Sequence, residues 1–218
     1  MKATRVFTQE EVWNNKLHQE YDSSDRTGTH VSDLTMCLRK TALSRLHNPV
    51  WETETLYRFT MGRSLEKAFF TSLMPEATQE LEVEKEGVVG HIDFAGEEVD
   101  YECKATWSRE LDVEEIFLTG KGRIKPKDYW VKQAGAYTHM RGRTKMNFIV
   151  FYLANPPKLR CYQLEWTEDE LHELWSGLIE NKNYLDMKDA IGELPYKTPQ
   201  TWQCNGCSYR KVCDESEL

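Results

Sequence analysis

Apolar residues in the first half of the chain change from a helical period to a strand period. Helical spacing predicts helices over residues 32–46 and 55–73. From residue 81 the apolar positions alternate, which predicts one strand or a bent pair of strands over 83–94. A turn at residues 95–97 and a return strand over 99–105 follow, so this region is expected to form a strand hairpin.

The second half of the chain alternates between predicted helices and strands. The sequence predicts a helix over 128–140, a buried strand over 146–154 and another strand over 159–166. A capping box at Thr167-x-x-Glu170 then begins a helix that runs to about residue 190. The order of elements indicates a mixed α/β core with a helical N-terminal part.

The length and the breaks in this pattern suggest one domain with two small appendages. A chain of 218 residues is long enough for one large domain with its own core. We expect an N-terminal helical extension over 1–30, the main α/β domain over 31–195 and a cysteine-containing tail over 196–218. The prolines between residues 192 and 203 are typical of a linker before the tail.

The composition excludes several classes of protein. With 39% hydrophobic and 29% charged residues, the chain is neither disordered nor collagen-like. The sequence contains no apolar run close to the ~20 residues that cross a bilayer, and residues 1–11 do not resemble a secretory signal. These features predict a soluble, cytoplasmic protein without a membrane partner. In that compartment six cysteines favour metal binding over disulfides.

A carboxylate and a Glu-x-Lys motif fall on the two arms of the predicted hairpin. Asp93 precedes Glu102 by nine residues across the turn, so the two carboxylates can face each other on paired strands. Glu102 and Lys104 share one strand face, while Cys103 points to the other. Converging carboxylates suit Mg²⁺ or Mn²⁺, and a neighbouring lysine suits phosphodiester hydrolysis. The alternative is a surface hairpin with ordinary salt bridges.

Three further polar residues could join this group. Glu66 lies within the apolar stripe of its predicted helix, where a carboxylate needs a partner. Gln133 and Tyr137 are four residues apart and lie on one helix face. The alternatives are a buried ion pair for Glu66 and ordinary packing for Gln133 and Tyr137.

Together these motifs resemble the PD-(D/E)xK nuclease superfamily and, within it, the RecB-like branch. The resemblance rests on Gly90-x-x-Asp93, Glu102-x-Lys104 and Gln133-x-x-x-Tyr137, which occur in family order. It implies a restriction-endonuclease-like core, a mixed sheet flanked by helices, and a bound Mg²⁺ or Mn²⁺. The implied metal ligands are Asp93, Glu102, the backbone carbonyl of Cys103 and Glu66. Among these, Glu66 departs from the family, because many relatives carry a histidine there.

The resemblance also assigns roles to the remaining site residues. Lys104 would be the catalytic lysine, and Gln133 and Tyr137 would orient the DNA and the surroundings of that lysine. Together with Asp93, Glu102 and Glu66, these residues make up the implied catalytic set.

Cysteines 204, 207 and 213 form a close group in the C-terminal tail. Their spacing, Cys204-x2-Cys207-x5-Cys213, allows three thiolates to reach one centre, and four are usually needed. Cys103 and Cys161 are interpreted as core residues, which leaves Cys37 as the remaining candidate. A structural zinc site is the alternative, although zinc sites more often use paired short spacings.

One early cysteine and three late ones, combined with the nuclease motifs, resemble the fourth CRISPR-associated (Cas) protein family. The resemblance covers about residues 30–215. It implies that Cys37, Cys204, Cys207 and Cys213 bind an iron–sulfur cluster of the 4Fe–4S type, with a structural role. It further implies a single-stranded DNA exonuclease that processes spacer precursors with the CRISPR integrase complex. The alternatives are a RecB-like phage or repair nuclease and a non-catalytic iron–sulfur DNA-binding module.

The formal net charge of −8 argues against a nucleic-acid partner, but the charge is unevenly placed. Between Lys121 and Lys145 there are eight basic residues and one acidic residue, a net charge of +7, so the rest of the chain carries −15. Basic residues interleaved with aromatic ones suit a single-stranded backbone and its bases. A solvated basic surface is the alternative. The predicted DNA contacts are Lys121, Arg123, Lys125, Lys127, Trp130, Lys132, Arg141 and Arg143.

Overall fold

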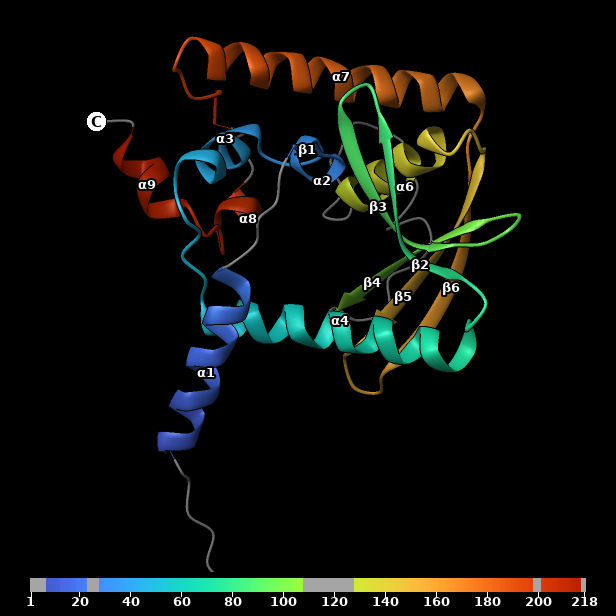
Figure 1. Cartoon of the computed structure of the whole chain (residues 1–218), viewed down its shortest axis with the longest axis horizontal. Coiled ribbons are helices and arrows are strands. Elements are labelled where there is room, and N and C mark those ends of the chain that lie inside the picture. Colours follow the sequence, from blue (N-terminus) through green and yellow to red (C-terminus); the bar gives the residue numbers. More distant parts are fainter. Residues whose placement is uncertain (1–6, 23–27, 108–127, 198–200, 217–218) are drawn as a thin grey trace, which may run out of the picture.

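A computed structural model describes residues 7–22, 28–107, 128–197 and 201–216 (Figure 1). Its longer helices are α1 (Phe7–Asp22), α3 (Leu38–Leu46), α4 (Thr53–Leu73), α6 (Asp128–Met140) and α7 (Glu168–Ala190). The shorter helices are α2 (Val31–Leu34), α8 (Thr201–Cys204) and α9 (Arg210–Glu215). The strands are β1 (Thr29–His30), β2 (Thr78–Lys85), β3 (Val88–Ala95), β4 (Asp100–Thr106), β5 (Lys145–Tyr152) and β6 (Lys158–Glu165).

The strands form one six-stranded mixed sheet in the order β1-β3-β4-β5-β6, with β2 paired to β3 off this path. Strands β4 and β5 run parallel, because the chain between them crosses over through α6. Strand β1 is parallel to β3, and the remaining pairs are antiparallel. The sequence prediction of a mixed α/β core is therefore confirmed.

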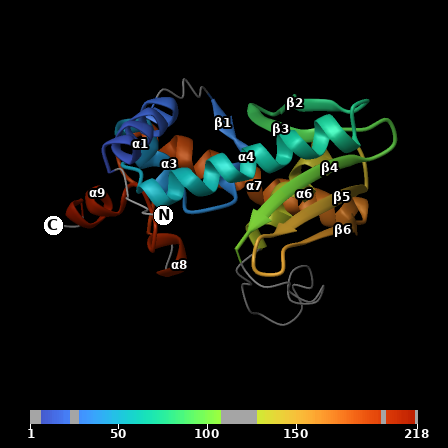
Figure 2. The same cartoon turned by 90° about the horizontal axis from the view of Figure 1, so that it is seen from below.

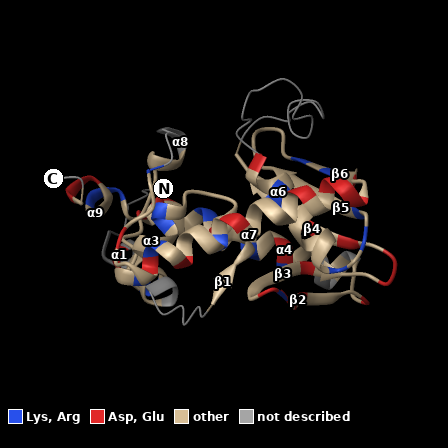
Figure 3. Cartoon of the chain, turned by 90° about the horizontal axis from the view of Figure 1, so that it is seen from above, with Lys and Arg blue, Asp and Glu red and all other residues tan. Residues whose placement is uncertain are grey.

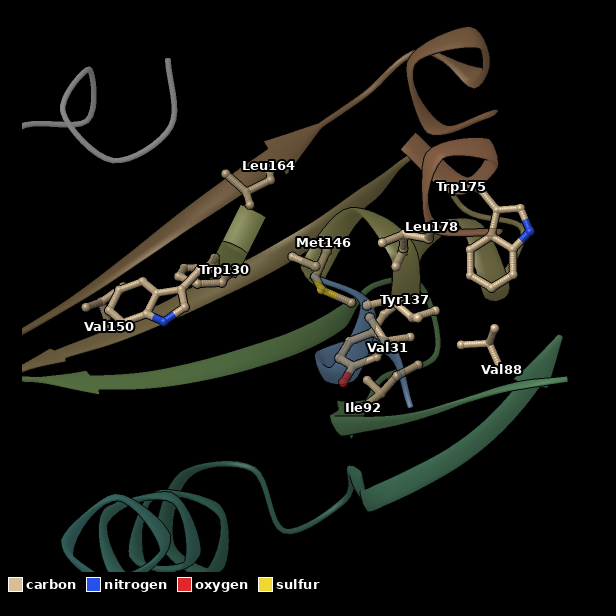
Figure 4. Packing of buried hydrophobic residues seen from close by; sticks show 14 of the residues in the cluster. Val31, Val88, Ile92, Trp130, Tyr137, Met146, Val150, Leu164, Trp175 and Leu178 are labelled. Carbon is tan, nitrogen blue, oxygen red and sulfur yellow. The ribbon is translucent and has the colours of Figure 1, made fainter. Parts of the chain in front are cut away.

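The central strand β5 alternates between two apolar layers, one on each face of the sheet. Phe148 and Val150 belong to the larger buried cluster with residues of α6 and α7, including Trp175 (Figure 4). Ile149 lies on the other face, in a smaller cluster against which Phe69 of α4 packs. The sheet is thus covered by α6 and α7 on one face and by α4 on the other (Figure 2). No helix in the described part of the chain is long and apolar enough to cross a membrane.

The region predicted over 83–94 as one strand or a bent pair of strands forms two strands joined by a tight turn. The second of these two predictions therefore fits the structure. Glu86 and Gly87 both have positive φ, 52° and 72°, and they connect β2 to β3. Positive φ at both central residues is the geometry of hairpin turns that match the twist of the flanking strands. The Trp175 indole donates a 3.0 Å hydrogen bond to Glu86 and holds the turn against α7.

The helix predicted over 32–46 is wrong as one continuous helix. It is divided into α2 and α3, and Cys37 at the start of α3 has extended backbone (φ −69°, ψ 110°). Side chains satisfy backbone groups of the α2 segment before this break. The Asp33 carboxylate accepts a 2.8 Å hydrogen bond from the His30 amide, and the Thr41 hydroxyl donates to the Asp33 carbonyl over 2.9 Å.

The helix that starts after Thr167 begins as its sequence predicts. The Glu170 amide donates to the Thr167 hydroxyl over 3.2 Å, and the Glu170 carboxylate accepts from the Thr167 amide over 2.8 Å. This reciprocal pair is the predicted capping box. It fixes the start of α7, whose buried side chains cover α6.

Candidate active site

Strands β3 and β4 separate from each other next to Asp93. Their ladder contains the pair Phe94–Tyr101, whereas β4 and β5 pair along the whole length of β4. Beyond this pair, the Cys103 amide donates a 2.6 Å hydrogen bond to Asp93 Oδ2 instead of to the β3 backbone. The Asp93 carboxylate thus replaces a backbone acceptor in the ladder between β3 and β4. It is held at the point where the two strands separate. We call this opening the β3–β4 fork.

Glu102 and Lys104 lie on one face of β4 at the same fork. The register places them opposite Phe148 and Val150 of β5, on the face that α6 covers. The Lys104 ammonium donates a hydrogen bond to Glu102 Oε1. Glu102 is only 1% exposed, and its second oxygen, Oε2, is buried with no hydrogen-bond partner among the described residues. A buried carboxylate oxygen without a donor is costly, so this atom is suited to a cation.

The carboxylates of the fork raise one another's pKa. Burial, and then the charge of Asp93, raises the pKa of Glu102 to about 8. Burial and Asp93 likewise raise the pKa of Glu66 to about 7, which places the α4 carboxylate at the same centre. Burial also raises the pKa of Asp93. Three carboxylates around one ammonium form a centre with too much negative charge, and a divalent cation would relieve it.

Lys104 stays protonated in this setting. Burial on its own lowers the pKa of Lys104, but the neighbouring charges of Glu102 and Asp93 outweigh burial and leave that pKa raised above its usual value. Half-buried Lys104 is therefore a fixed positive charge and hydrogen-bond donor within the fork.

Gln133 and Tyr137 meet behind the fork. Gln133 Nε2 donates a 2.8 Å hydrogen bond to the Tyr137 hydroxyl, so the two residues predicted to share a helix face are in contact. Tyr137 is 4% exposed, and burial, followed by the charge of Glu102, raises the pKa of its phenol. The ring lies over Gly90, where an added Cβ would approach Tyr137 Cε1 to 2.8 Å. The glycine of the Gly-x-x-Asp motif therefore permits close packing of α6 on β3.

Replacing Gly90 with alanine is expected to destabilise the protein by about 1–3 kcal/mol, because the Tyr137 ring and α6 must shift. Urea unfolding followed by circular dichroism measures the change. Gly177→Ala is the control, since a Cβ there meets no atom within 4 Å and alanine favours the α7 helix. Equal stabilities of the two variants would contradict the packing role of Gly90.

Glu80 is a further acidic residue at the fork that the sequence did not reveal. It follows Gln79, which pairs with Phe94, so its place on β2 is opposite Asp93. Its φ of +47° is unusual for a residue other than glycine, and its charge raises the pKa of both Asp93 and Glu66. In the sequence Glu80 begins the pattern Glu80-x-Glu82-x-Glu84, and nothing distinguishes it from the other two.

Of the residues predicted to contact DNA, Trp130 lines a cavity beside Glu66 and Lys104, and the described basic ones are ion-paired within the protein. Arg141 and Arg143 pair with buried Asp100, each over 3.1 Å, and Lys132 pairs with Asp128 over 3.0 Å. Trp130 is 5% exposed and packs against Phe148, so its ring is part of the core. The structure thus gives these residues contacts within the protein. The other predicted contacts, Lys121, Arg123, Lys125 and Lys127, lie outside the described residues.

The four cysteines predicted to share a centre lie around one cavity. Cys37, Cys204, Cys207 and Cys213 all line it, where the start of α3 meets the C-terminal tail. All four are free thiols, and the surrounding wall is largely apolar. Within the described residues, however, no three His, Cys, Asp or Glu side chains are arranged to hold a metal ion, here or at the fork.

Hydrogen bonds tie the cysteine tail to the N-terminal half. The Arg39 guanidinium donates to the Pro195 carbonyl over 3.3 Å and to the Ser216 hydroxyl over 2.9 Å. The Val50 amide donates to the Ser208 carbonyl over 3.2 Å. These contacts bring Cys37 to the tail although it lies far away in the sequence.

The other two cysteines differ from each other. Cys103 is buried with Phe94 and Ile149 on the sheet face opposite Glu102, as predicted. The prediction that Cys161 is a core residue is wrong, because Cys161 is exposed. Strand β6 is the edge strand of the sheet, and most of its side chains face solvent.

Comparison with known proteins places the fold. No protein-family model matches the chain, and no curated protein matches it either. Among solved structures, SSO0001 is similar over 96% of this chain and 98% of its own, with a TM-score of 0.53 and 16% identity. An alkaline exonuclease from Laribacter hongkongensis is similar over 79% of this chain and 95% of its own, with a TM-score of 0.53 and 16% identity.

A phage-related exonuclease from Haemophilus somnus 129PT is similar over 79% of this chain and all of its own, with a TM-score of 0.51 and 12% identity. The fold of this chain is therefore similar to that of SSO0001 and of these two exonucleases. At these identities the likeness concerns the fold, a mixed sheet flanked by helices, and chemistry has to be argued from the residues of the fork.

Proposed function

We propose that this chain is a metal-dependent DNA exonuclease whose active site is the β3–β4 fork. The observation that carries the proposal is the contact of buried Glu102 with half-buried Lys104 beside half-buried Asp93, joined by Glu66 from α4. Raised carboxylate pKa values and the unpartnered Glu102 Oε2 support a divalent cation at this position. The likeness in fold to an alkaline and a phage-related exonuclease supports the same reaction class.

In this proposal Asp93, Glu102, the Cys103 carbonyl and Glu66 would hold Mg²⁺ or Mn²⁺. When bound, the ion would polarise the phosphate and lower the pKa of a water molecule. Lys104 places its ammonium where negative charge develops on the phosphate, and its raised pKa keeps it charged. Gln133 and Tyr137 pack behind Lys104 and hold its surroundings in place.

The finer proposal is that the substrate is single-stranded DNA or an overhang, processed as a spacer precursor in CRISPR adaptation. The arrangement of the four cysteines supports it, because it resembles that of the fourth Cas family. The protein would then be cytoplasmic and could act with the CRISPR integrase complex. Likeness to the phage-related exonuclease favours the second candidate, a phage or repair nuclease outside CRISPR loci.

We also propose that Cys37, Cys204, Cys207 and Cys213 bind an iron–sulfur cluster, of the 4Fe–4S type. Four free thiols around one largely apolar cavity fit such a group in their chemistry. Bound there, the cluster would join the N-terminal helices to the tail and stabilise the fold.

Incubation of end-labelled single-stranded and blunt duplex DNA with Mn²⁺ tests the reaction and its substrate. Stepwise shortening from an end of the single strand, with little change in the duplex, is the expected result. Faster shortening of the duplex would favour the second candidate. Absence of shortening of either substrate would contradict the proposed function.

The metal-free protein is expected to lose stability as the pH rises from about 4.5 to 8. The folded pKa values of Glu66 and Glu102, about 7 and about 8, exceed the ordinary value of 4.5, so the folded state binds more protons than the unfolded chain in this window. The stabilisation that comes from these extra protons is fully present below pH 4.5. It is lost as the pH rises through the folded pKa values of Glu66 and Glu102. Mn²⁺ would replace the protons, so it should raise the melting temperature more at pH 8 than at pH 6. An equal rise at both pH values would contradict this linkage.

A further inference from the structure

A groove with a volume of about 700 Å³ leads away from the fork along α4. Glu66 and Lys104 line one part of it, and Arg58, Phe59 and Gly62 line another. Its remaining walls come from the ends of β4 and β5 and the start of α6. We call this cavity the α4 groove.

The walls of the α4 groove combine aromatic rings with positive charge. Phe59 is 40% exposed, with Trp51 packed edge-on against its ring, and Trp107, just after β4, is 51% exposed. Arg58 is exposed and makes no ion pair or hydrogen bond with the described residues. Acidic and basic positions are interspersed over the helices and the sheet (Figure 3). Exposed rings beside a guanidinium are suited to unpaired bases and a phosphate backbone.

Gly62 leaves open space in the middle of this wall. A Cβ added at Gly62 meets no atom within 4 Å, so packing within the protein does not require glycine there. Glycine inside a helix is less favourable than alanine, so Gly62 lowers the stability of α4. Gly62 lies one turn from Phe59 and one turn from Glu66, between the exposed ring and the carboxylate of the fork.

We propose that the α4 groove binds the unpaired strand of the substrate and guides it to the fork. Arg58 holds a backbone phosphate, and Phe59 and Trp107 stack on bases. Gly62 lets the strand approach α4 closely. Arg58 lies eight residues before Glu66, or about 12 Å along the helix. The phosphate that Arg58 binds therefore belongs to a different nucleotide of the strand from the one cleaved at the fork. This inference rests on the proposed function and adds the path of the strand.

DNA binding without cleavage tests the groove. Fluorescence anisotropy of a labelled oligothymidylate, with the full-length protein and EDTA, gives the dissociation constant at several salt concentrations. Arg58→Ala is expected to weaken binding about tenfold and to reduce the salt slope by roughly 0.7, the loss of one phosphate contact on a single strand. Trp107→Ala is expected to weaken binding about five- to hundredfold, the range for one stacked base.

Occlusion of the groove gives an independent test. Gly62→Trp should weaken binding at least about tenfold, by filling the groove, whereas Gly62→Ala adds one methyl group and should weaken binding less and melt at a higher temperature. Lys67→Ala removes the same charge from α4 outside the groove and is the control for Arg58→Ala. Circular dichroism of each variant verifies that it is folded.

Two results would overturn the proposal. If Arg58→Ala and Gly62→Trp bind DNA as well as Lys67→Ala does, while wild type degrades DNA, the groove is not the path of the strand and the proposed function stands. If wild type neither binds nor degrades single-stranded DNA, the proposed function fails and the groove proposal fails with it.

Discussion

Glu102→Gln is expected to abolish DNA hydrolysis and at the same time to stabilise the metal-free protein. Glu102 is 1% exposed, and its burial, followed by the charges of Asp93 and Glu66, raises its pKa to about 8. A neutral amide removes that repulsion but no longer attracts a divalent cation. We expect at least about a 100-fold loss of activity, in line with the loss of a preorganised electrostatic group. The free energy of unfolding in EDTA at pH 8 should rise by on the order of 1–3 kcal/mol.

Glu98→Gln is the matched control for Glu102→Gln. Glu98 lies in the turn between β3 and β4 and is exposed, so its replacement removes the same charge without changing the fork. Activity and stability of this variant should stay close to wild type. Activity of Glu102→Gln close to wild type, or a loss of its stability in EDTA, would contradict our description of the fork.

Cys207→Ser is expected to prevent binding of the iron–sulfur cluster and to lower the melting temperature. The four cysteines line one cavity between α3 and the tail, so the loss of one ligand should release the tail from the N-terminal helices. A crosslink of this kind is worth about 2–5 kcal/mol, or roughly 5–15 °C in a chain of this size. Iron and sulfide analysis, visible absorbance and calorimetry after anaerobic purification measure the effect.

Cys161→Ser provides the control for Cys207→Ser, because Cys161 is exposed on the edge strand and far in the fold from the cavity lining. It should retain iron, colour and melting temperature. A colourless wild-type protein that holds zinc instead would refute the cluster.

Local signals in the sequence predicted most of the regular elements. The helix over 128–140 coincides with α6, because its ends carry clear signals and its apolar face repeats regularly. The fork could be predicted because its parts are close in sequence. Nine residues and one turn separate Asp93 from Glu102, and the period of a strand puts Lys104 beside Glu102. The Gln133–Tyr137 contact follows from helix geometry in the same way.

Features that depend on distant partners could not be predicted. The hairpin turn places Glu86 at positive φ, a position that usually carries Asn, Asp or Gly, and a hydrogen bond from Trp175 on α7 holds it. The ion pairs of Arg141 and Arg143 could not be predicted, because their partner, Asp100, lies some forty residues earlier. The alternation of Cys161 with its neighbour predicted a core position. Its strand, β6, lies at the edge of the sheet, and a single sequence does not reveal the order of strands.

Hydrolysis of DNA at the β3–β4 fork should depend on Lys104. The most direct measurement compares wild type, Lys104→Ala and Lys188→Ala for the shortening of end-labelled single-stranded DNA with Mn²⁺. Lys104 is held in the fork by Glu102, whereas Lys188 pairs with Glu193 near the end of α7. We predict that wild type and Lys188→Ala shorten the DNA at similar rates and that Lys104→Ala is slower by at least about 100-fold. Equal rates for all three proteins would contradict the claim.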